Sequence, residues 1–159
     1  MERLWAPWRM QYIGVEQRPG CLFCRVIDDP DDPDAQLVLW RPQGAIAMLN
    51  KFPYNPGHTM VAPVKHTSTF EELDDAQLLE LAHAQNRVLT VIRSVMSPDG
   101  FNVGANLGKA AGAGIPDHAH MHIVPRWNGD TNFMAVIDDV KVVNEALAQT
   151  ANKLRRAFA

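Results

Sequence analysis

Three histidines, His118, His120 and His122, occupy every second position of one short segment, with apolar residues between and after them. Successive side chains of a β-strand point to opposite faces, so this spacing predicts a strand with one imidazole face and one apolar face. Imidazole titrates near neutral pH, and it acts both as a nucleophile and as a metal ligand. Because three of the six histidines fall here, we expect chemistry on phosphate or on a metal rather than a polar surface strand.

Length and composition predict a single domain over residues 1–159. A chain of 159 residues with 47% hydrophobic content can form one substantial core and is too short for two. We divide it into an N-terminal arm (1–20), a core with the cysteine and histidine motifs (21–125) and a C-terminal extension that ends in a helix (126–159). Trp5, Trp8 and Tyr12 indicate that the arm packs on a surface, such as a partner subunit.

Charge and hydropathy exclude several classes of protein. The formal net charge of −3 argues against an electrostatic nucleic-acid binder and leaves a nucleotide ligand open. Apolar runs are too short to cross a bilayer, and the first residues lack the order of a secretion signal, so we expect a cytoplasmic protein without a membrane partner. Cys21 and Cys24 would stay reduced in the cytoplasm, which favours a metal or redox role over a structural disulfide.

Apolar periodicity predicts a mixture of strands and two helices. Residues 37–40 and 45–49 are expected to pair as a hairpin, which begins an antiparallel sheet. Further strands are expected at residues 58–63, at 101–105 and through the three histidines, a long helix at 70–95, and a C-terminal helix at 140–158. The acidic stretch 28–34 has two prolines and no aliphatic residue, which predicts a solvated loop.

The alternating histidines and the residues around them resemble the signature of the histidine-triad (HIT) proteins, a family of nucleotidyl hydrolases and transferases. The resemblance extends through residues 56–66, 102–106 and 125–133. Residues 4–12 look like the branch that contains bacterial diadenosine tetraphosphate phosphorylases. The resemblance implies an α+β domain with an antiparallel sheet, one long central helix and a C-terminal helix, assembled as a homodimer.

The resemblance also implies catalytic roles. The position of His120 matches the family histidine that attacks the α-phosphorus of a nucleotide and forms a nucleotidyl-histidine. A neutral imidazole attacks only if its other nitrogen is held by an acceptor, and we expect a backbone carbonyl there. His122 would donate to phosphate oxygens or to the departing group, and His58 would complete the pocket, although His58 could instead simply end a loop.

Two asparagines match family positions that contact the nucleotide, and two glycines fit the same picture. Asn50 resembles the residue that binds the ribose hydroxyls, and Asn106 resembles an asparagine near the phosphates. Gly112 and Gly114 would let the backbone approach the ligand and present N–H groups to it. Other branches have Gln or Ser at the position of Gly114, so a side-chain contact is replaced here by backbone or water.

The cysteine pair requires two more ligands if it binds zinc, because structural zinc sites are usually closed by four N or S donors. In some family members the remaining ligands match His66 and His118. The resemblance therefore implies a structural zinc on Cys21, Cys24, His66 and His118, with His120 free to react. Alternatively, the two cysteines could form a redox pair or could merely be two buried small residues.

The predicted function is cleavage of dinucleoside polyphosphates, by a diadenosine tetraphosphate phosphorylase or hydrolase, through a nucleotidyl-histidine. Hydrolysis of nucleoside phosphoramidates or other small nucleotide conjugates is the alternative within enzymes. A non-catalytic nucleotide-binding zinc protein is the alternative outside them. Trp127, Asn132 and Phe133 could stack on a nucleobase or pack at a subunit interface.

Overall fold

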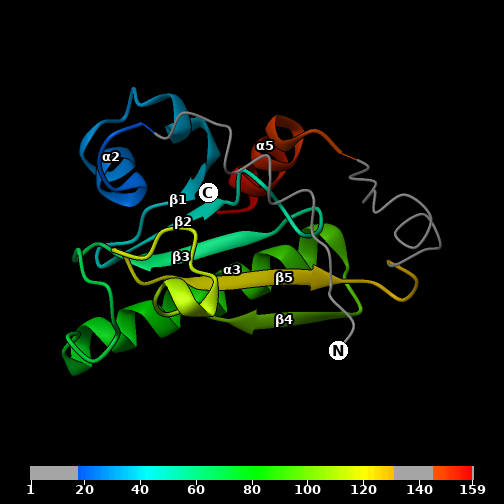
Figure 1. Cartoon of the computed structure of the whole chain (residues 1–159). Coiled ribbons are helices and arrows are strands. Elements are labelled where there is room, and N and C mark those ends of the chain that lie inside the picture. The colour runs from blue at the N-terminus through cyan, green and yellow to red at the C-terminus, as the bar shows by residue number, and fades with distance from the viewer. Residues whose placement is uncertain (1–17, 131–144, 159) are drawn as a thin grey trace.

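The computed structural model describes residues 18–130 and 145–158, which form an antiparallel sheet flanked by helices (Figure 1). The five strands lie in the order β1-β2-β3-β5-β4, and every neighbouring pair is antiparallel. Their bounds are β1 (Val38–Trp40), β2 (Ala45–Leu49), β3 (Thr59–Pro63), β4 (Gly100–Gly104) and β5 (Met121–Arg126). The α+β class with an antiparallel sheet is confirmed.

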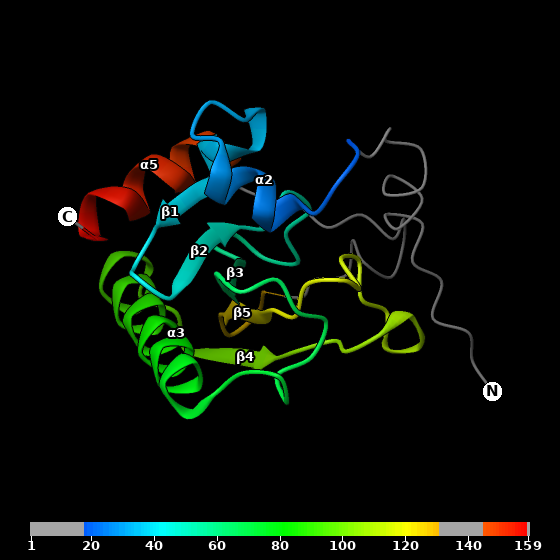
Figure 2. The ribbon, with the colours of Figure 1, turned by 90° about the vertical axis from the view of Figure 1, so that its left-hand side faces the viewer.

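The α-helices and two short 3₁₀ helices surround this sheet. They are α2 (Leu22–Asp28), η2 (Pro33–Leu37), α3 (Asp75–Met96), η3 (Lys109–Ala111) and α5 (Leu147–Phe158). Helix α3 packs against β2, β3 and β5, whereas α5 packs against β1, η2 and α3. Figure 2 shows α3 along one side of the sheet. Helix α2 and the loop that contains η3 lie apart from α3. Among the described residues, none of the helices has the length and hydropathy needed to span a membrane.

The core lies between α3 and the middle of the sheet. All residues of β2 and β3 are buried, so both faces of these strands are covered. Helix α3 contributes one buried face, made by Leu81, Ala84, Val88, Val91 and Ile92. Apolar residues at this helical spacing form a stripe that packs on a sheet, which is why the long amphipathic segment was expected to be the central helix.

The long helix begins five residues later than periodicity predicts, at Asp75 rather than at residue 70. The Asp74 side chain accepts from the N–H of Gln77 (2.9 Å), and the Gln77 side chain accepts from the N–H of Asp74 (3.1 Å). This capping box satisfies backbone donors of the first turn and starts the helix at that point. The helix ends before Ser97, which has a φ of 48°.

The predicted start of the strand through the three histidines is wrong, because β5 begins only at Met121. His118 and His120 lie in the segment before it. The N–H of Ala119 donates to the carbonyl of Thr67 (2.6 Å), which belongs to a loop and not to β3. The C-terminal helix likewise begins at Leu147 instead of 140, and residues 140–144 lie outside the described part of the chain.

The acidic stretch is not a solvated loop throughout. Asp32 and Asp34 are buried, and Arg25 forms ion pairs with both carboxylates, at 3.2 and 3.1 Å. Asp34 also pairs with Lys51 (3.1 Å), and η2 begins directly at Pro33. A hydrogen bond from the N–H of Asp34, followed by the Arg25 guanidinium, lowers the pKa of Asp32. Arg25 and Lys51 lie outside the acidic stretch, which explains why the composition of this stretch does not predict the burial.

Candidate functional site

Three of the predicted site histidines lie together in the structure. Nε2 of His58 is 2.9 Å from Nδ1 of His122, and the rings of His120 and His122 are 4.8 Å apart between centroids. His58 and His120 are buried, although histidines are usually found at least partly exposed. His58 directly precedes β3, so the pairing of β3 with β5 brings it beside His122.

Backbone carbonyls orient the ring nitrogens of two histidines. Nδ1 of His120 lies 2.8 Å from the carbonyl oxygen of His118, and Nε2 of His118 lies 2.8 Å from the carbonyl oxygen of Pro63. A carbonyl oxygen only accepts hydrogen bonds, so both of these nitrogens must carry a proton. In the neutral rings, Nε2 of His120 and Nδ1 of His118 therefore keep their lone pairs.

The tautomers of His58 and His122 follow from a backbone donor. The N–H of Tyr54 donates to Nδ1 of His58 (3.1 Å), so in the neutral ring the proton of His58 is on Nε2. That N–H then donates to Nδ1 of His122. The remaining nitrogen of neutral His122, Nε2, is consequently a hydrogen-bond donor.

Burial favours the neutral form of three of these histidines, His118, His120 and His122. Burial lowers the pKa of His122 to about 4, with the nearby His120 as the second cause. Burial also lowers the pKa of His120 and of His118. A neutral imidazole retains a nucleophilic nitrogen, which a protonated ring lacks.

A pocket of about 1010 Å³ opens beside His120 and His122, which form part of its wall. His58, which was expected to complete the pocket, is fully buried behind His122 and is not among the described residues that line it. The predicted ligand-binding residues Asn50, Asn106, Gly112 and Gly114 also line it. Gly112 has a φ of 82°, a conformation that favours glycine. The structure thus brings residues from β2, the loop after β4 and the histidine segment to one cavity.

Other wall residues are not indicated by the sequence pattern. Tyr54 stacks on His58 with 4.7 Å between ring centroids, and it lines the pocket together with Arg25, Asp34 and Lys51. An aromatic residue four positions before His58 is a weak signal. The pocket lining among the described residues does not include Trp127, and Asn132 and Phe133 lie outside the described ranges.

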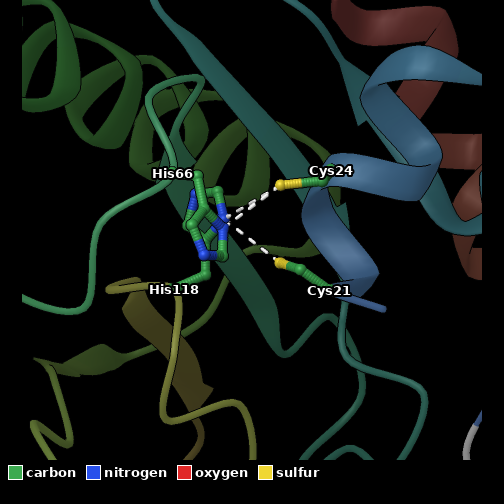
Figure 3. A group of neighbouring side chains, drawn as sticks. All are labelled: Cys21, Cys24, His66 and His118. Carbon is green, nitrogen blue, oxygen red and sulfur yellow. Dashed lines mark hydrogen bonds between the residues drawn. The ribbon is translucent and has the colours of Figure 1, made fainter. Parts of the chain in front are cut away.

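The second group of predicted residues forms a cluster that could bind a metal (Figure 3). The ligand atoms of Cys21, Cys24, His66 and His118 all lie within 4.8 Å of one another. Sγ of Cys21 is 3.2 Å from Nδ1 of His118, and Sγ of Cys24 is 3.2 Å from Nδ1 of His66 and 3.8 Å from Nδ1 of His118. The cysteines come from the start of α2, and the histidines from two loops.

These distances and donors match tetrahedral coordination. With typical zinc–sulfur and zinc–nitrogen bonds, the sulfur–nitrogen edges of a tetrahedron are about 3.6 Å. Nδ1 of His118 carries its lone pair toward the sulfurs, because Nε2 donates to Pro63. Burial, followed by the hydrogen bond to Cys21, raises the pKa of Cys24 to about 11. A cation reverses this effect, because it stabilises the thiolate.

Comparison with known proteins agrees with this geometry. The family model of the HIT domain matches residues 34–129, and this range includes all six histidines. The chain belongs to the HIT family. An AP-4-A phosphorylase of Mycobacterium tuberculosis is 38% identical over 166 residues, which cover 100% of this HIT protein and 85% of the relative.

Solved structures show the same HIT fold. A hypothetical histidine triad nucleotide-binding protein from Sulfolobus tokodaii has a TM-score of 0.69 and 28% identity, over 86% of this chain and 91% of that chain. A Zn-bound histidine triad family protein from Mycobacterium smegmatis also has a TM-score of 0.69, with 27% identity over 87% of this chain and 92% of that chain.

Proposed function

We propose that this HIT protein cleaves dinucleoside polyphosphates through a covalent nucleotidyl intermediate on His120. The observation that carries the proposal is the hydrogen bond from Nδ1 of His120 to the carbonyl of His118. It leaves the lone pair of Nε2 on a buried, neutral ring in the pocket wall. The same bond would stabilise the positive charge that develops on the ring during attack.

In the first step, the lone pair of His120 Nε2 forms a bond to the α-phosphorus of the substrate. The bond from this phosphorus to the bridging oxygen breaks, and the departing nucleoside polyphosphate keeps the electron pair on that oxygen. His122 would donate a hydrogen bond from Nε2 to the departing oxygen, and His58 would hold His122 in this tautomer.

In the second step, an oxygen of inorganic phosphate or of water attacks the same phosphorus. The nitrogen–phosphorus bond breaks, and its electron pair returns to Nε2 of His120. Attack by phosphate makes the enzyme a phosphorylase, and attack by water, with loss of a proton to solvent, makes it a hydrolase. Identity of 38% to an AP-4-A phosphorylase favours phosphate.

The volume of the pocket supports the proposal of a nucleotide substrate larger than a mononucleotide. Its volume of about 1010 Å³ lies at the upper end of the usual range for small-molecule sites. We assign Asn50 to the ribose. Its Oδ1 accepts from the N–H of Phe52 (2.9 Å), and its amide nitrogen, which has no hydrogen-bond partner among the described residues, could donate to a hydroxyl. Asn106, Gly112 and Gly114 would contact the phosphates.

We further propose that the group of Cys21, Cys24, His66 and His118, here called the Cys21 cluster, holds a structural zinc. The donor set of two sulfurs and two imidazoles is typical of closed zinc sites. Four protein ligands leave no open coordination position, so zinc would supply a cross-link between chain segments. A HIT relative of known structure is zinc-bound.

We also propose a homodimer formed through β4. This strand is at one end of the sheet order, and Val103 on it is 42% exposed. The outer strand at the opposite end, β1, is covered by α5, since Arg155 donates to the carbonyl of Val38 (2.7 Å). Among the described residues β4 has no neighbouring strand on its outer side, and such an edge presents N–H and C=O groups that a second copy can pair.

The test of the reaction is to incubate the purified protein with diadenosine tetraphosphate, with and without inorganic phosphate, and to identify the products by chromatography. ATP plus ADP formed only with phosphate would support a phosphorylase. AMP plus ATP without phosphate would support an asymmetric hydrolase. No cleavage under either condition would contradict the proposal and direct the search to nucleoside phosphoramidates.

A further inference from the structure

The ring of His58 is located by the turn that precedes it. The N–H of Tyr54 donates to Nδ1 of His58 (3.1 Å), and the N–H of His58 donates to the carbonyl of Asn55 (3.0 Å). Both contacts come from the backbone of consecutive residues. A shift of this turn would therefore move the ring and remove the donor that sets its tautomer.

The side chain of Asn55 ties this turn to β5. Asn55 is only 1% exposed, and its Nδ2 donates to the carbonyl of Pro125 and to Oδ2 of Asp130, both at 2.8 Å. Pro125 lies in β5, three residues after His122. One buried amide group thus connects the segment that carries His58 to the strand that carries His122.

The acceptor carboxylate of Asp130 is itself fixed by several donors. Arg126 donates to it from Nε (2.6 Å) and Nη2 (2.9 Å), and the N–H of Trp127 donates at 3.2 Å. Because a bidentate guanidinium and a backbone donor both hold the carboxylate, its orientation toward Asn55 is well defined.

We propose that Asn55 is a positioning residue for the His58–His122 pair, with Asp130 as its anchor. The inference rests on the proposed function. The pocket lining among the described residues includes neither Asn55 nor Asp130, so both would act through His58. Their contribution would be to hold the two rings at 2.9 Å, with Nε2 of His122 as the donor to the leaving oxygen.

The test compares two aryl esters of AMP that differ only in the leaving group. In both, the bond from phosphorus to the phenolic oxygen breaks and the phenolate leaves with the electron pair. 4-Nitrophenolate spreads this charge over its ring, whereas phenolate depends more on a hydrogen bond from His122. A displaced His58–His122 pair should therefore slow cleavage of the phenyl ester much more than cleavage of the 4-nitrophenyl ester.

Asn55→Asp is the main variant, because it keeps the shape of the side chain and replaces the donor by an oxygen that repels Asp130. The leaving group departs in the first step, which kcat/KM reports. We expect kcat/KM for the phenyl ester to fall about 100-fold, and kcat/KM for the 4-nitrophenyl ester to fall less than about tenfold. Asn102→Ala is the matched control, since it removes only the hydrogen bond from Nη1 of Arg126 (2.7 Å). Its ratio of rates should equal that of the wild type.

A second readout does not depend on activity. In ¹⁵N-histidine spectra of the wild type, the proton of His58 should be on Nε2, with coupling across the hydrogen bond to His122. Asn55→Asp should lose this coupling. If Asn55→Asp does not fold, Asp130→Asn replaces it in both measurements, with smaller changes in the same direction expected.

Equal losses for the two esters, together with an unchanged spectrum, would overturn the positioning role. If the wild type cleaves neither ester, the spectra alone decide whether Asn55 positions the pair: loss of the coupling supports the role and its retention overturns it. The proposed function fails only if diadenosine tetraphosphate is not cleaved either. The two proposals therefore fail in different ways.

Discussion

His118 serves three different purposes through three different atoms. Its Nδ1 faces Sγ of Cys21, its Nε2 donates to Pro63, and its backbone oxygen accepts from Nδ1 of His120. A metal bound to the His118 ring would therefore be linked to the proposed nucleophile, His120, through a single residue. Metal ligation and orientation of the nucleophile depend on the same residue, although we assign them to separate sites.

Spacing along the sequence predicts which histidines gather, but not which nitrogen of each ring is protonated. The atoms that decide this are the backbone oxygens of His118 and Pro63 and the N–H of Tyr54. Any residue type presents such groups, so a sequence pattern carries little information about them. The expectation that a backbone carbonyl would hold His120 is confirmed.

At the residue scale we predict a pH dependence of stability from His122. Its pKa is about 4 in the folded protein and about 6.5 in an unfolded chain, so the unfolded state binds more protons between these values. The free energy of unfolding should therefore decrease as the pH falls from about 6.5 to about 4. Urea unfolding of the wild type and of His122→Gln at several pH values checks this.

The variant lacks this titration, so its stability should decline less steeply over the same pH range. The metal-ligating residues are unchanged in both proteins, and their protonation cancels in the comparison. Parallel pH profiles of the two proteins would contradict the depressed pKa of His122.

At the scale of elements, the start of α3 depends on the reciprocal cap between Asp74 and Gln77. Asp74→Ala removes the acceptor for the N–H of Gln77 and should lower the free energy of unfolding by about 1 kcal/mol, as measured in urea. Glu71→Ala is the matched control, because it removes an exposed carboxylate from the loop before the cap. A loss of equal size in both variants would show that the cap has no special contribution.

The bounds of a helix or strand are predicted best where residues close in sequence determine them. The strand at residues 45–49 is observed with the same bounds. The strand through the histidines starts late because Ala119 bonds to the loop carbonyl of Thr67, a partner distant in sequence. The burial of Asp34 likewise depends on Arg25 of α2 and on Lys51 in the loop after β2, which both lie outside the acidic stretch.

At the scale of the whole molecule, the Cys21 cluster joins three segments that are far apart in sequence: the start of α2, the loop after β3 and the segment before β5. We predict about one zinc per chain by metal analysis. Cys24→Ser should lose the metal and lower Tm, because binding free energy adds to folding stability. His83→Ala, which changes an exposed histidine of α3, should retain metal and Tm.

Removal of zinc by a chelator should reproduce the loss of Tm in the wild type. A metal-free protein with an unchanged Tm would contradict a structural metal. The residues of this cluster were predicted from family resemblance, whereas the wall of the pocket was predicted only in part, because it is assembled from many elements.

The proposed dimer makes a prediction at the same scale. Sedimentation equilibrium should give twice the mass of the chain, and Val103→Lys should weaken association, because it adds a charge to the exposed edge of β4. Ala148→Lys adds the same charge to an exposed position of α5 and should leave association unchanged. A monomeric wild type would contradict the dimer.

The covalent step at His120 is the central claim, and intact-protein mass spectrometry tests it most directly. The wild type is mixed with diadenosine tetraphosphate in the absence of inorganic phosphate and denatured in alkali during the first turnover. We predict an adenylyl adduct that maps to His120, is lost in acid and is absent from His120→Ala. Cleavage of the substrate by His120→Ala at the wild-type rate, or an adduct on another residue, would contradict the mechanism.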